Sequence, residues 1–282
     1  MRTDDTVIDV QLAARKEARL NQILLSTGSA LIAFSGGVDS SFLLFKAVRL
    51  LGNENVIAVT AASILRPSEE MEQSRLIAGN LKVRHIIVET DELGLEKIHA
   101  NPPQRCYYCK KELYEKMVAL ARKYGSKTVM DGTITEDEEE YRPGLKATAE
   151  TGVESPLKEA RLTKEEIRYL SRKYGLVTWN KPTTTCLATR FPYGEKLDRE
   201  KLMRVAAAEQ VLRKMGIAGT LRVRSHGKLA RIEIGQTEIP GLLEKRKELV
   251  SKLKDLGFDY VTLDLEGFRS GSMDMHIADN KG

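Results

Sequence analysis

A short apolar run that leads into a glycine-rich loop constrains the fold of this chain more than any other feature. Residues 30–34 (ALIAF) have the length and composition of a buried strand, and residues 35–40 (SGGVDS) follow without a spacer. Apolar spacing then predicts a helix over 40–51, which ends near Gly52. Two adjacent glycines permit a tight turn with inward-facing amide groups, and the helix contributes the positive end of its dipole. We therefore predict an anion-binding loop between a strand and a helix.

Strands and helices alternate over the first two thirds of the chain. Apolar runs predict strands at residues 30–34, 56–61, 83–89 and 127–130, and helical spacing predicts helices at 9–25, 40–51, 69–80 and 110–124. This alternation is typical of βαβ units, in which crossover helices cover a parallel sheet. The predicted fold class is therefore α/β, with a doubly wound parallel sheet.

The pattern changes after Lys181-Pro182. The order becomes helix, two strands, helix and strand, at residues 197–215, 221–225, 230–234, 239–256 and 260–265. Such an order predicts a small α+β domain. We therefore place a first domain at residues 1–190, a second at 191–270, and a tail at 271–282 that we expect to be disordered.

Charge and cysteine content limit the kinds of partner. A net charge of +5 suits an anionic ligand such as a nucleotide, but it is too small to argue for nucleic acid. No apolar run is long enough to cross a bilayer, and the acidic N-terminus lacks the order of a signal peptide, so we expect a cytoplasmic protein. Three cysteines, an odd number, argue against a disulfide framework and for metal or redox chemistry.

The loop at residues 35–40 resembles the SGGxDS signature of the PP-loop ATP pyrophosphatases, an adenine nucleotide α-hydrolase-like group that cleaves ATP to AMP and pyrophosphate. It is not a Walker A loop, because the GxxxxGK[ST] pattern is absent. Asp39 is suited to hold Mg²⁺ on the phosphate oxygens. Asp131 and Gly132 end a predicted strand, at the sheet edge where ligands of open α/β folds bind. The expected nucleotide ligands are Ser35, Gly36, Gly37, Val38, Asp39, Ser40, Asp131 and Gly132.

Four further segments resemble the LarE family of sulfur transferases, and with the loop they span nearly the whole chain. They are Asp131–Thr133, Glu140–Ala147, Lys181–Gly194 and Leu221–Ile234, with Glu at position 140 where the family often has Asp. The resemblance implies that ATP adenylates a carboxylate of pyridinium-3,5-biscarboxylic acid mononucleotide. Sulfur then replaces the activated oxygen and yields a thiocarboxylate used to assemble the nickel-pincer cofactor. It also implies a homo-oligomer and a sulfide or other sulfur donor.

The cysteines form a C-x-x-C pair, Cys106 and Cys109, and a distant Cys186. The pair opens a predicted helix, whose N-terminus lowers the pKa of thiols, so both are suited to bind a metal. Unrelated cysteines, a redox pair and a zinc site are alternatives, although no fourth zinc ligand stands near. Resemblance to LarE proteins adds two: Cys186 as a sacrificial sulfur donor, or a [4Fe–4S] cluster held by Cys106, Cys109 and Cys186. We favour the cluster, because it uses all three cysteines and leaves one iron open for hydrosulfide.

Basic side chains are the candidates for the substrate. Arg190, Arg222 and Arg224 are expected to clamp a substrate phosphate, since the guanidinium fork matches phosphate oxygens. Arg142 and Lys146 are further candidate phosphate ligands. The residues expected to take part in catalysis are Cys186, Asp39 and Lys110.

Three other functions are compatible with the loop. A cluster-dependent tRNA thiolase would use the same adenylation, but it needs a basic surface for RNA that the sequence does not show. A ligase related to GMP or NAD synthetases would use ammonia and no iron. A nucleotide- or cluster-binding carrier would release no pyrophosphate.

Overall fold

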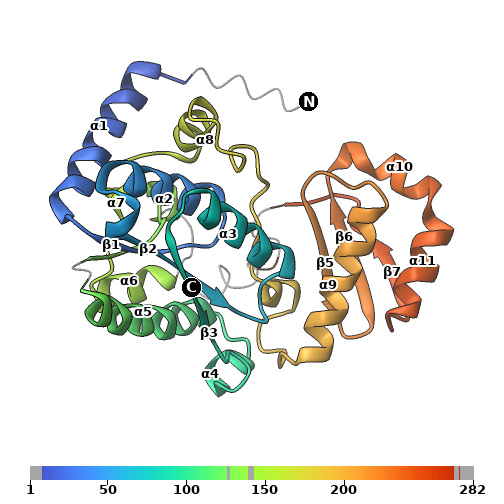
Figure 1. The fold of residues 1–282 in the computed structure, drawn as a ribbon. Coiled ribbons are helices and arrows are strands. Elements are labelled where there is room, and N and C mark those ends of the chain that lie inside the picture. The colour runs from blue at the N-terminus through green and yellow to red at the C-terminus, as the bar shows by residue number, and fades with distance from the viewer. Residues whose placement is uncertain (1–7, 126–127, 139–142, 270–272, 274–282) are drawn as a thin grey trace, which may run out of the picture. The chain divides into compact units, whose positions relative to one another are not determined.

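The structure is a computed structural model that describes residues 8–125, 128–138, 143–269 and 273 of the chain (Figure 1). The described residues form two compact units. The first unit takes those within Met1–Ala62, Ser68–Thr90 and Cys106–Lys181, and the second takes those within Ser63–Pro67, Asp91–Arg105 and Pro182–Gly282. The predicted boundary after residue 190 lies inside the second unit, and the predicted tail lies outside the described residues except for Met273.

A four-stranded parallel sheet forms the centre of the first unit. Its strands, in spatial order, are β3 (Arg84–Glu89), β2 (Val56–Ala62), β1 (Ala30–Ala33) and β4 (Thr128–Met130). Ala30 of β1 stands opposite Val56 and Thr128, so these three strands begin level and their carboxyl ends share one edge. Parallel strands joined through helices confirm the predicted α/β fold class.

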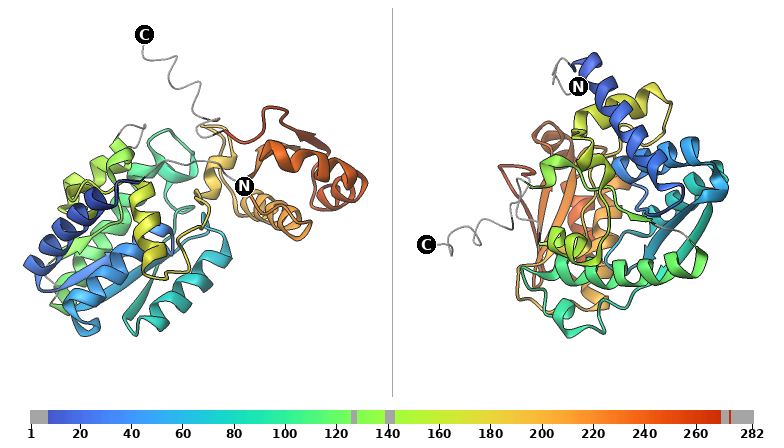
Figure 2. Two further views of the ribbon diagram at one scale, coloured as in Figure 1. Left: turned by 90° about the horizontal axis from the view of Figure 1, so that it is seen from above. Right: turned by 90° about the vertical axis from the view of Figure 1, so that its left-hand side faces the viewer.

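Helices connect these strands along the chain (Figure 2). They are α1 (Val10–Thr27), α2 (Val38–Leu51), α3 (Ser68–Asn80), α5 (Arg105–Tyr124), α6 (Gly144–Thr151), α7 (Pro156–Glu159) and α8 (Lys164–Lys173). A capping box of Thr163 and Glu166 begins α8. Among the helices that the structure describes, none is long and apolar enough to span a membrane.

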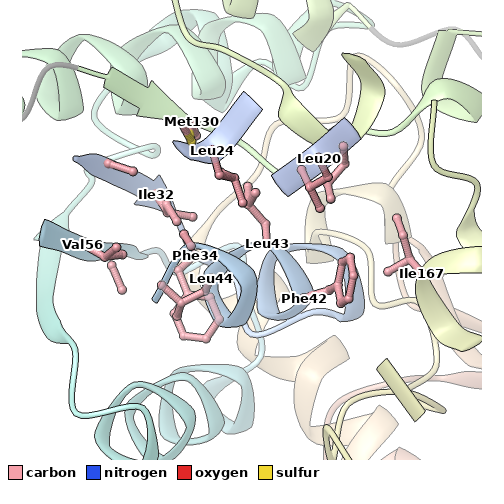
Figure 3. Close-up of a cluster of buried hydrophobic side chains, with 14 of the residues drawn as sticks. Leu20, Leu24, Ile32, Phe34, Phe42, Leu43, Leu44, Val56, Met130 and Ile167 are labelled. Carbon is pink, nitrogen blue, oxygen red and sulfur yellow. The ribbon is translucent and has the colours of Figure 1, made fainter. Parts of the chain in front are cut away.

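The sheet is buried on both faces. Ile32 of β1 packs with Leu24 of α1 and Leu44 of α2 in one hydrophobic core (Figure 3). The neighbouring residue, Leu31, points to the opposite face and packs with Met117 of α5 in a second core. Burial of both faces explains why the strands are continuous apolar runs rather than alternating ones.

The second unit contains a smaller, mixed sheet in the order β5 (Leu221–His226), β6 (Leu229–Ile234) and β7 (Tyr260–Leu263). Strands β5 and β6 form the predicted antiparallel hairpin, and β7 pairs parallel to β6. The helices of this unit are α4 (Glu96–His99), α9 (Arg199–Lys214), α10 (Ile239–Glu244) and α11 (Arg246–Asp255).

The single helix predicted over residues 239–256 is wrong, because α10 and α11 are separate helices that meet at Lys245. The backbone of Lys245, at φ −94° and ψ 12°, leaves the helical region and interrupts the hydrogen-bond ladder. Its ammonium donates to the carbonyl oxygen of Met215 at 2.8 Å, which fixes the side chain at the break.

A buried ionic cluster joins α1, α2 and the end of α8. The Glu17 and Lys46 side chains are both buried, and Lys46 Nζ donates to Glu17 Oε1 at 2.7 Å. The Tyr174 hydroxyl donates to the same oxygen at 2.5 Å. Burial raises the pKa of Glu17, but the hydrogen bonds from Lys46 and Tyr174 outweigh burial and hold the pKa below its ordinary value of 4.5. Burial and the bond to Glu17 raise the pKa of Tyr174 to about 12.

We expect Glu17→Gln to lower the free energy of unfolding at pH 7 by about 2–3 kcal/mol, because it leaves the buried Lys46 ammonium without a countercharge. A carboxyl group whose pKa is lowered by folding stabilises the protein above its unfolded pKa and loses that contribution as the pH falls through its folded pKa. The difference between wild type and Glu17→Gln should therefore shrink below pH 4.5. Urea unfolding across this pH range measures both effects.

Glu248→Gln is the matched control, because Glu248 pairs with Lys252 on the exposed surface of α11. We expect this variant to unfold like the wild type. An equal loss in both variants, or a Glu17→Gln loss that is the same at every pH, would contradict the role assigned to the buried cluster.

Candidate functional site

The predicted anion-binding loop is a tight turn between β1 and α2. Gly36 has φ 73°, in the left-handed region that glycine adopts without strain. The hydroxyl oxygens of Ser35 and Ser40 lie 2.9 Å apart, and the Gly37 amide donates to Ser35 Oγ at 3.3 Å. These bonds close the turn against the first turn of α2. The loop therefore presents a helix N-terminus, with its orphan amide groups, at the carboxyl end of β1.

Two lysines that are distant in the chain contact this loop. Lys164 Nζ lies 2.5 Å from Asp39 Oδ2, and Lys181 Nζ donates to the Gly36 carbonyl oxygen at 3.1 Å. Neither lysine was predicted as a site residue from the sequence. Both nevertheless lie in segments that carry a resemblance: Lys181 in one of the LarE-like segments, and Lys164 in residues 163–168, which resemble a stretch shared with GMP synthetase-like proteins.

Asp39 fits the Mg²⁺ ligand that the sequence predicts. Its Oδ1 atom is buried and has no hydrogen-bond partner among the residues that the structure describes. An unsatisfied carboxylate oxygen beside an anion-binding loop is the donor that Mg²⁺ prefers when it bridges protein and phosphate.

Asp131 ends β4 and is a buried carboxylate. Burial raises its pKa, but the Lys110 charge and hydrogen bonds from Tyr114, Ser155 and Thr133 outweigh burial and lower the pKa below its usual value. The Tyr114 hydroxyl donates at 2.6 Å, and the Ser155 and Thr133 hydroxyls donate at 2.7 Å. Hydrogen bonds from three other side chains therefore hold the Asp131 carboxylate in place at the carboxyl end of β4.

Gly132 brings this strand end against the loop. A Cβ atom at Gly132 would lie 3.0 Å from the Ser40 backbone nitrogen and 3.2 Å from its Cα atom. Both atoms belong to the backbone of the first turn of α2, so the contact cannot be relieved by a change of side-chain rotamer. The position therefore favours glycine, because a larger residue would push the first turn of α2 away, and the close approach places Gly132 beside Ser40, a predicted nucleotide ligand.

Lys110 is the predicted catalytic residue that adjoins the C-x-x-C pair. Its Nζ atom lies 3.6 Å from Asp131 Oδ2, so the ammonium is directed toward the carboxyl end of β4. Lys146, a candidate phosphate ligand, is exposed, and its Nζ atom lies 3.8 Å from Glu150 Oε1. Arg142, the other candidate, lies outside the described residues.

The cysteines belong to different units. Cys106 is exposed and Cys109 half-buried, and their separation of three places both on one side of the first turn of α5. Cys186 is half-buried in the second unit, where it is the N-cap of the short 3-10 helix η3 (Leu187–Arg190). Among the described residues, no three Cys, His, Asp or Glu side chains are gathered to hold a metal ion. The predicted cluster therefore stays a prediction.

The three predicted phosphate-clamping arginines are buried, and all donate to backbone carbonyls of the segment that carries Cys186. Arg222 donates to the Thr183 carbonyl at 2.9 Å. Arg190 donates to the Cys186 carbonyl at 3.3 Å, and Arg224 donates to the Thr189 carbonyl at 2.7 Å. The arginines thus fix the backbone on both sides of the Cys186 thiol.

Charge compensation distinguishes Arg222 from the other two. Arg190 makes a two-pronged ion pair with Glu209 at 2.8 and 3.1 Å, and Arg224 pairs with Glu233 at 2.9 Å. Arg222 has no carboxylate within ion-pair distance in the part of the chain that the structure describes. Burial, and then the charge of Arg190, lower the pKa of Arg222 to about 10. The charge of Glu209 opposes this shift only in part. A buried guanidinium without a carboxylate at ion-pair distance is suited to accept an anion.

The chain is similar to known proteins throughout both units. A family model described as NAD synthase matches residues 15–102. An uncharacterized protein of Synechocystis sp. is 42% identical over 260 residues, 92% of this chain and 96% of that protein. The pyridinium-3,5-bisthiocarboxylic acid mononucleotide synthase of Lactiplantibacillus plantarum is 41% identical over 260 residues, 92% of this chain and 94% of the synthase. An uncharacterized protein of Methanocaldococcus jannaschii is 32% identical over 240 residues, 85% of this chain and 90% of that protein.

We expect Gly132→Ala to weaken ATP binding about tenfold or more, because the new methyl group displaces the first turn of α2 and misaligns the loop amides. Isothermal titration calorimetry measures the affinity, with an ATP analogue that cannot be cleaved between its α- and β-phosphates. Gly79→Ala in α3 is the matched control, since a Cβ atom at Gly79 meets nothing within 4 Å. The affinity of this variant for the ATP analogue should equal that of the wild type. Wild-type affinity in Gly132→Ala would contradict the role assigned to this contact.

Proposed function

The chain belongs to the LarE family of ATP-dependent sulfur transferases, and from this premise we propose its substrate and its sulfur chemistry. The substrate is pyridinium-3,5-biscarboxylic acid mononucleotide, and the product is a thiocarboxylate destined for the nickel-pincer cofactor. The observation that carries this proposal is 41% identity to a pyridinium-3,5-bisthiocarboxylic acid mononucleotide synthase over 92% of the chain. The anion-binding loop of residues 35–40 supports the ATP-dependent step.

Adenylation proceeds at the loop. A substrate carboxylate oxygen forms a bond to the α-phosphorus of ATP, the bond from that phosphorus to the bridging oxygen breaks, and pyrophosphate leaves. The loop amides and the start of α2 stabilise the negative charge on the phosphates, and Asp39 would hold Mg²⁺ there. A sulfur nucleophile then attacks the acyl carbon, and AMP leaves with the oxygen. The chain's own residues act by positioning and electrostatics.

The substrate's 5′-phosphate binds at Arg222. This guanidinium is buried, and its charge is not balanced by a carboxylate within ion-pair distance among the described residues. Arg190 and Arg224 carry their own carboxylates and hold the Cys186 segment in place. Of the three arginines predicted to clamp the phosphate, Arg222 therefore binds it, and Arg190 and Arg224 position the backbone.

We expect Arg222→Gln to weaken binding of pyridinium-3,5-biscarboxylic acid mononucleotide about tenfold or more, because a charge-assisted contact with phosphate is lost. ATP binding should be unchanged. The control is Arg204→Gln: like Arg222, Arg204 donates to a backbone carbonyl and stacks on a phenylalanine ring of the second unit. Titration calorimetry with the mononucleotide checks both variants, and equal losses in both would contradict the assignment.

The sulfur source is a [4Fe–4S] cluster held by Cys106, Cys109 and Cys186. When bound, such a cluster supplies an iron without a protein thiolate, on which hydrosulfide can be presented. The donor chemistry supports it: Cys106 and Cys109 share one side of the first turn of α5, and two thiol ligands at this spacing are suited to one cluster. Two buried ion pairs and three arginine–carbonyl contacts fix the segment that carries Cys186.

Protein purified without oxygen should contain about four irons and four acid-labile sulfides per chain, with a broad visible absorption band. Replacing any one of Cys106, Cys109 and Cys186 by serine should abolish the band. Tyr108→Phe, which alters the residue between the paired cysteines, is the matched control and should retain the iron. Iron-free protein that makes thiocarboxylate once per chain, with loss of the Cys186 sulfur, would contradict the cluster and favour the sacrificial mechanism.

A further inference from the structure

A buried asparagine joins two loops of the second unit. Asn101 is completely buried. Its amide nitrogen donates to the carbonyl oxygens of Pro192 at 2.9 Å and Phe191 at 3.5 Å, and its side-chain oxygen accepts a hydrogen bond from Arg105. With the amide turned the other way, its oxygen would face two carbonyl oxygens, so the partners decide its orientation. Every polar atom of this side chain thus has a partner, as burial requires.

Backbone hydrogen bonds tie the same two loops together. The Gly194 amide donates to the Asn101 carbonyl oxygen and the Leu197 amide donates to the His99 carbonyl oxygen, each at 2.9 Å. Asn101 has φ 49°, in the left-handed region that asparagine enters more readily than most residues. In this conformation its carbonyl group and its side chain both reach residues 191–194. Asparagine at this position therefore contributes through its backbone and its side chain.

The two loops lead to the cysteines of the proposed sulfur site. Arg105 is the first residue of α5 and directly precedes Cys106 in the chain. Phe191 is the C-cap of η3, and Cys186 is the N-cap of the same short helix. Both loops belong to the second unit. The contacts of Asn101 therefore hold the chain that enters the C-x-x-C pair in a fixed position relative to the segment that carries Cys186.

We propose that Asn101 is a positioning residue of the sulfur site, which sets the approach of the Cys106 thiol to the Cys186 thiol. The inference rests on the proposed use of these cysteines as ligands of one cluster. Thiolates from distant parts of a chain hold a common cluster only where the fold brings them together, and residues behind the ligands supply that alignment. Asparagine suits this role, because its neutral amide offers two donors and one acceptor and brings no charge of its own.

Thiol bridging tests the alignment without iron. Dibromobimane becomes fluorescent when it bridges two thiols a few ångströms apart, and in a Cys109→Ser background Cys106 and Cys186 are the two cysteines of the chain. Reduced, iron-free protein of this background should become fluorescent, and mass spectrometry should find the two peptides joined. Adding Asn101→Asp should slow the bridging about tenfold or more, because a carboxylate cannot donate to the two carbonyl oxygens and repels them.

Asn53→Asp is the matched control. The Asn53 amide also donates to a backbone carbonyl oxygen, that of Lys82, but on the exposed surface of the first unit. In the Cys109→Ser background this variant should bridge as fast as the protein without it. The affinity for an uncleavable ATP analogue should be that of the wild type in both asparagine variants, which separates lost alignment from unfolding. Asn101→Gly keeps the left-handed backbone and removes only the side-chain amide, so it is a second test variant and should also bridge slowly.

Cys109→Ser protein that forms no bimane bridge would overturn the inference whatever the variants do. Bridging at full rate in both Asn101→Asp and Asn101→Gly would overturn it as well. In protein with all three cysteines, purified without oxygen, Asn101→Asp should also weaken the visible band of the cluster, a signature that Asn53→Asp should leave unchanged. Wild-type protein without iron, together with rapid bridging that depends on Asn101, would overturn the proposed cluster and leave the alignment standing.

Discussion

The start of α2 packs against the end of β4 with no side chain between them, and the rest of the first unit depends on this contact. Gly132 permits the approach, and Asp131 anchors the strand end through Tyr114, Ser155 and Thr133. The contact fixes the direction of the α2 amides relative to the sheet edge. A helix N-terminus binds phosphate well when it is held in place, so we expect the buried Asp131 network to support the predicted anion site.

Charge is organised differently in the two units. In the first unit, two lysines contact the loop: Lys164 pairs with the Asp39 carboxylate, and Lys181 donates to the Gly36 carbonyl oxygen. In the second unit, buried arginines are saturated by carboxylates and carbonyls, which makes the Cys186 segment rigid. Arg222 is the exception, because no carboxylate among the described residues lies within ion-pair distance of it, and we proposed it for that reason as the ligand of the substrate phosphate.

These two kinds of charge network suit the two steps of the chemistry. Adenylation moves negative charge from the substrate carboxylate to the leaving pyrophosphate, and preorganised amide and cationic groups stabilise that charge. Sulfur transfer needs a nucleophile or its carrier at a fixed position, because a small misplacement of the reacting atoms costs much of the rate.

The sequence by itself determined the α/β fold class, the loop at residues 35–40, the β5–β6 hairpin and the family, because each rests on periodicity or motifs within short stretches of chain. It also named Gly132, without the reason that only the packing against Ser40 supplies. It did not foresee the break at Lys245, nor the contact of Lys164 with Asp39, which lies 125 residues away in the chain. It treated Arg190, Arg222 and Arg224 alike, since arginines look the same until their partners are known. Only the tertiary structure decided which of these guanidinium groups pair with a carboxylate, because pairing depends on which distant side chains folding brings within reach.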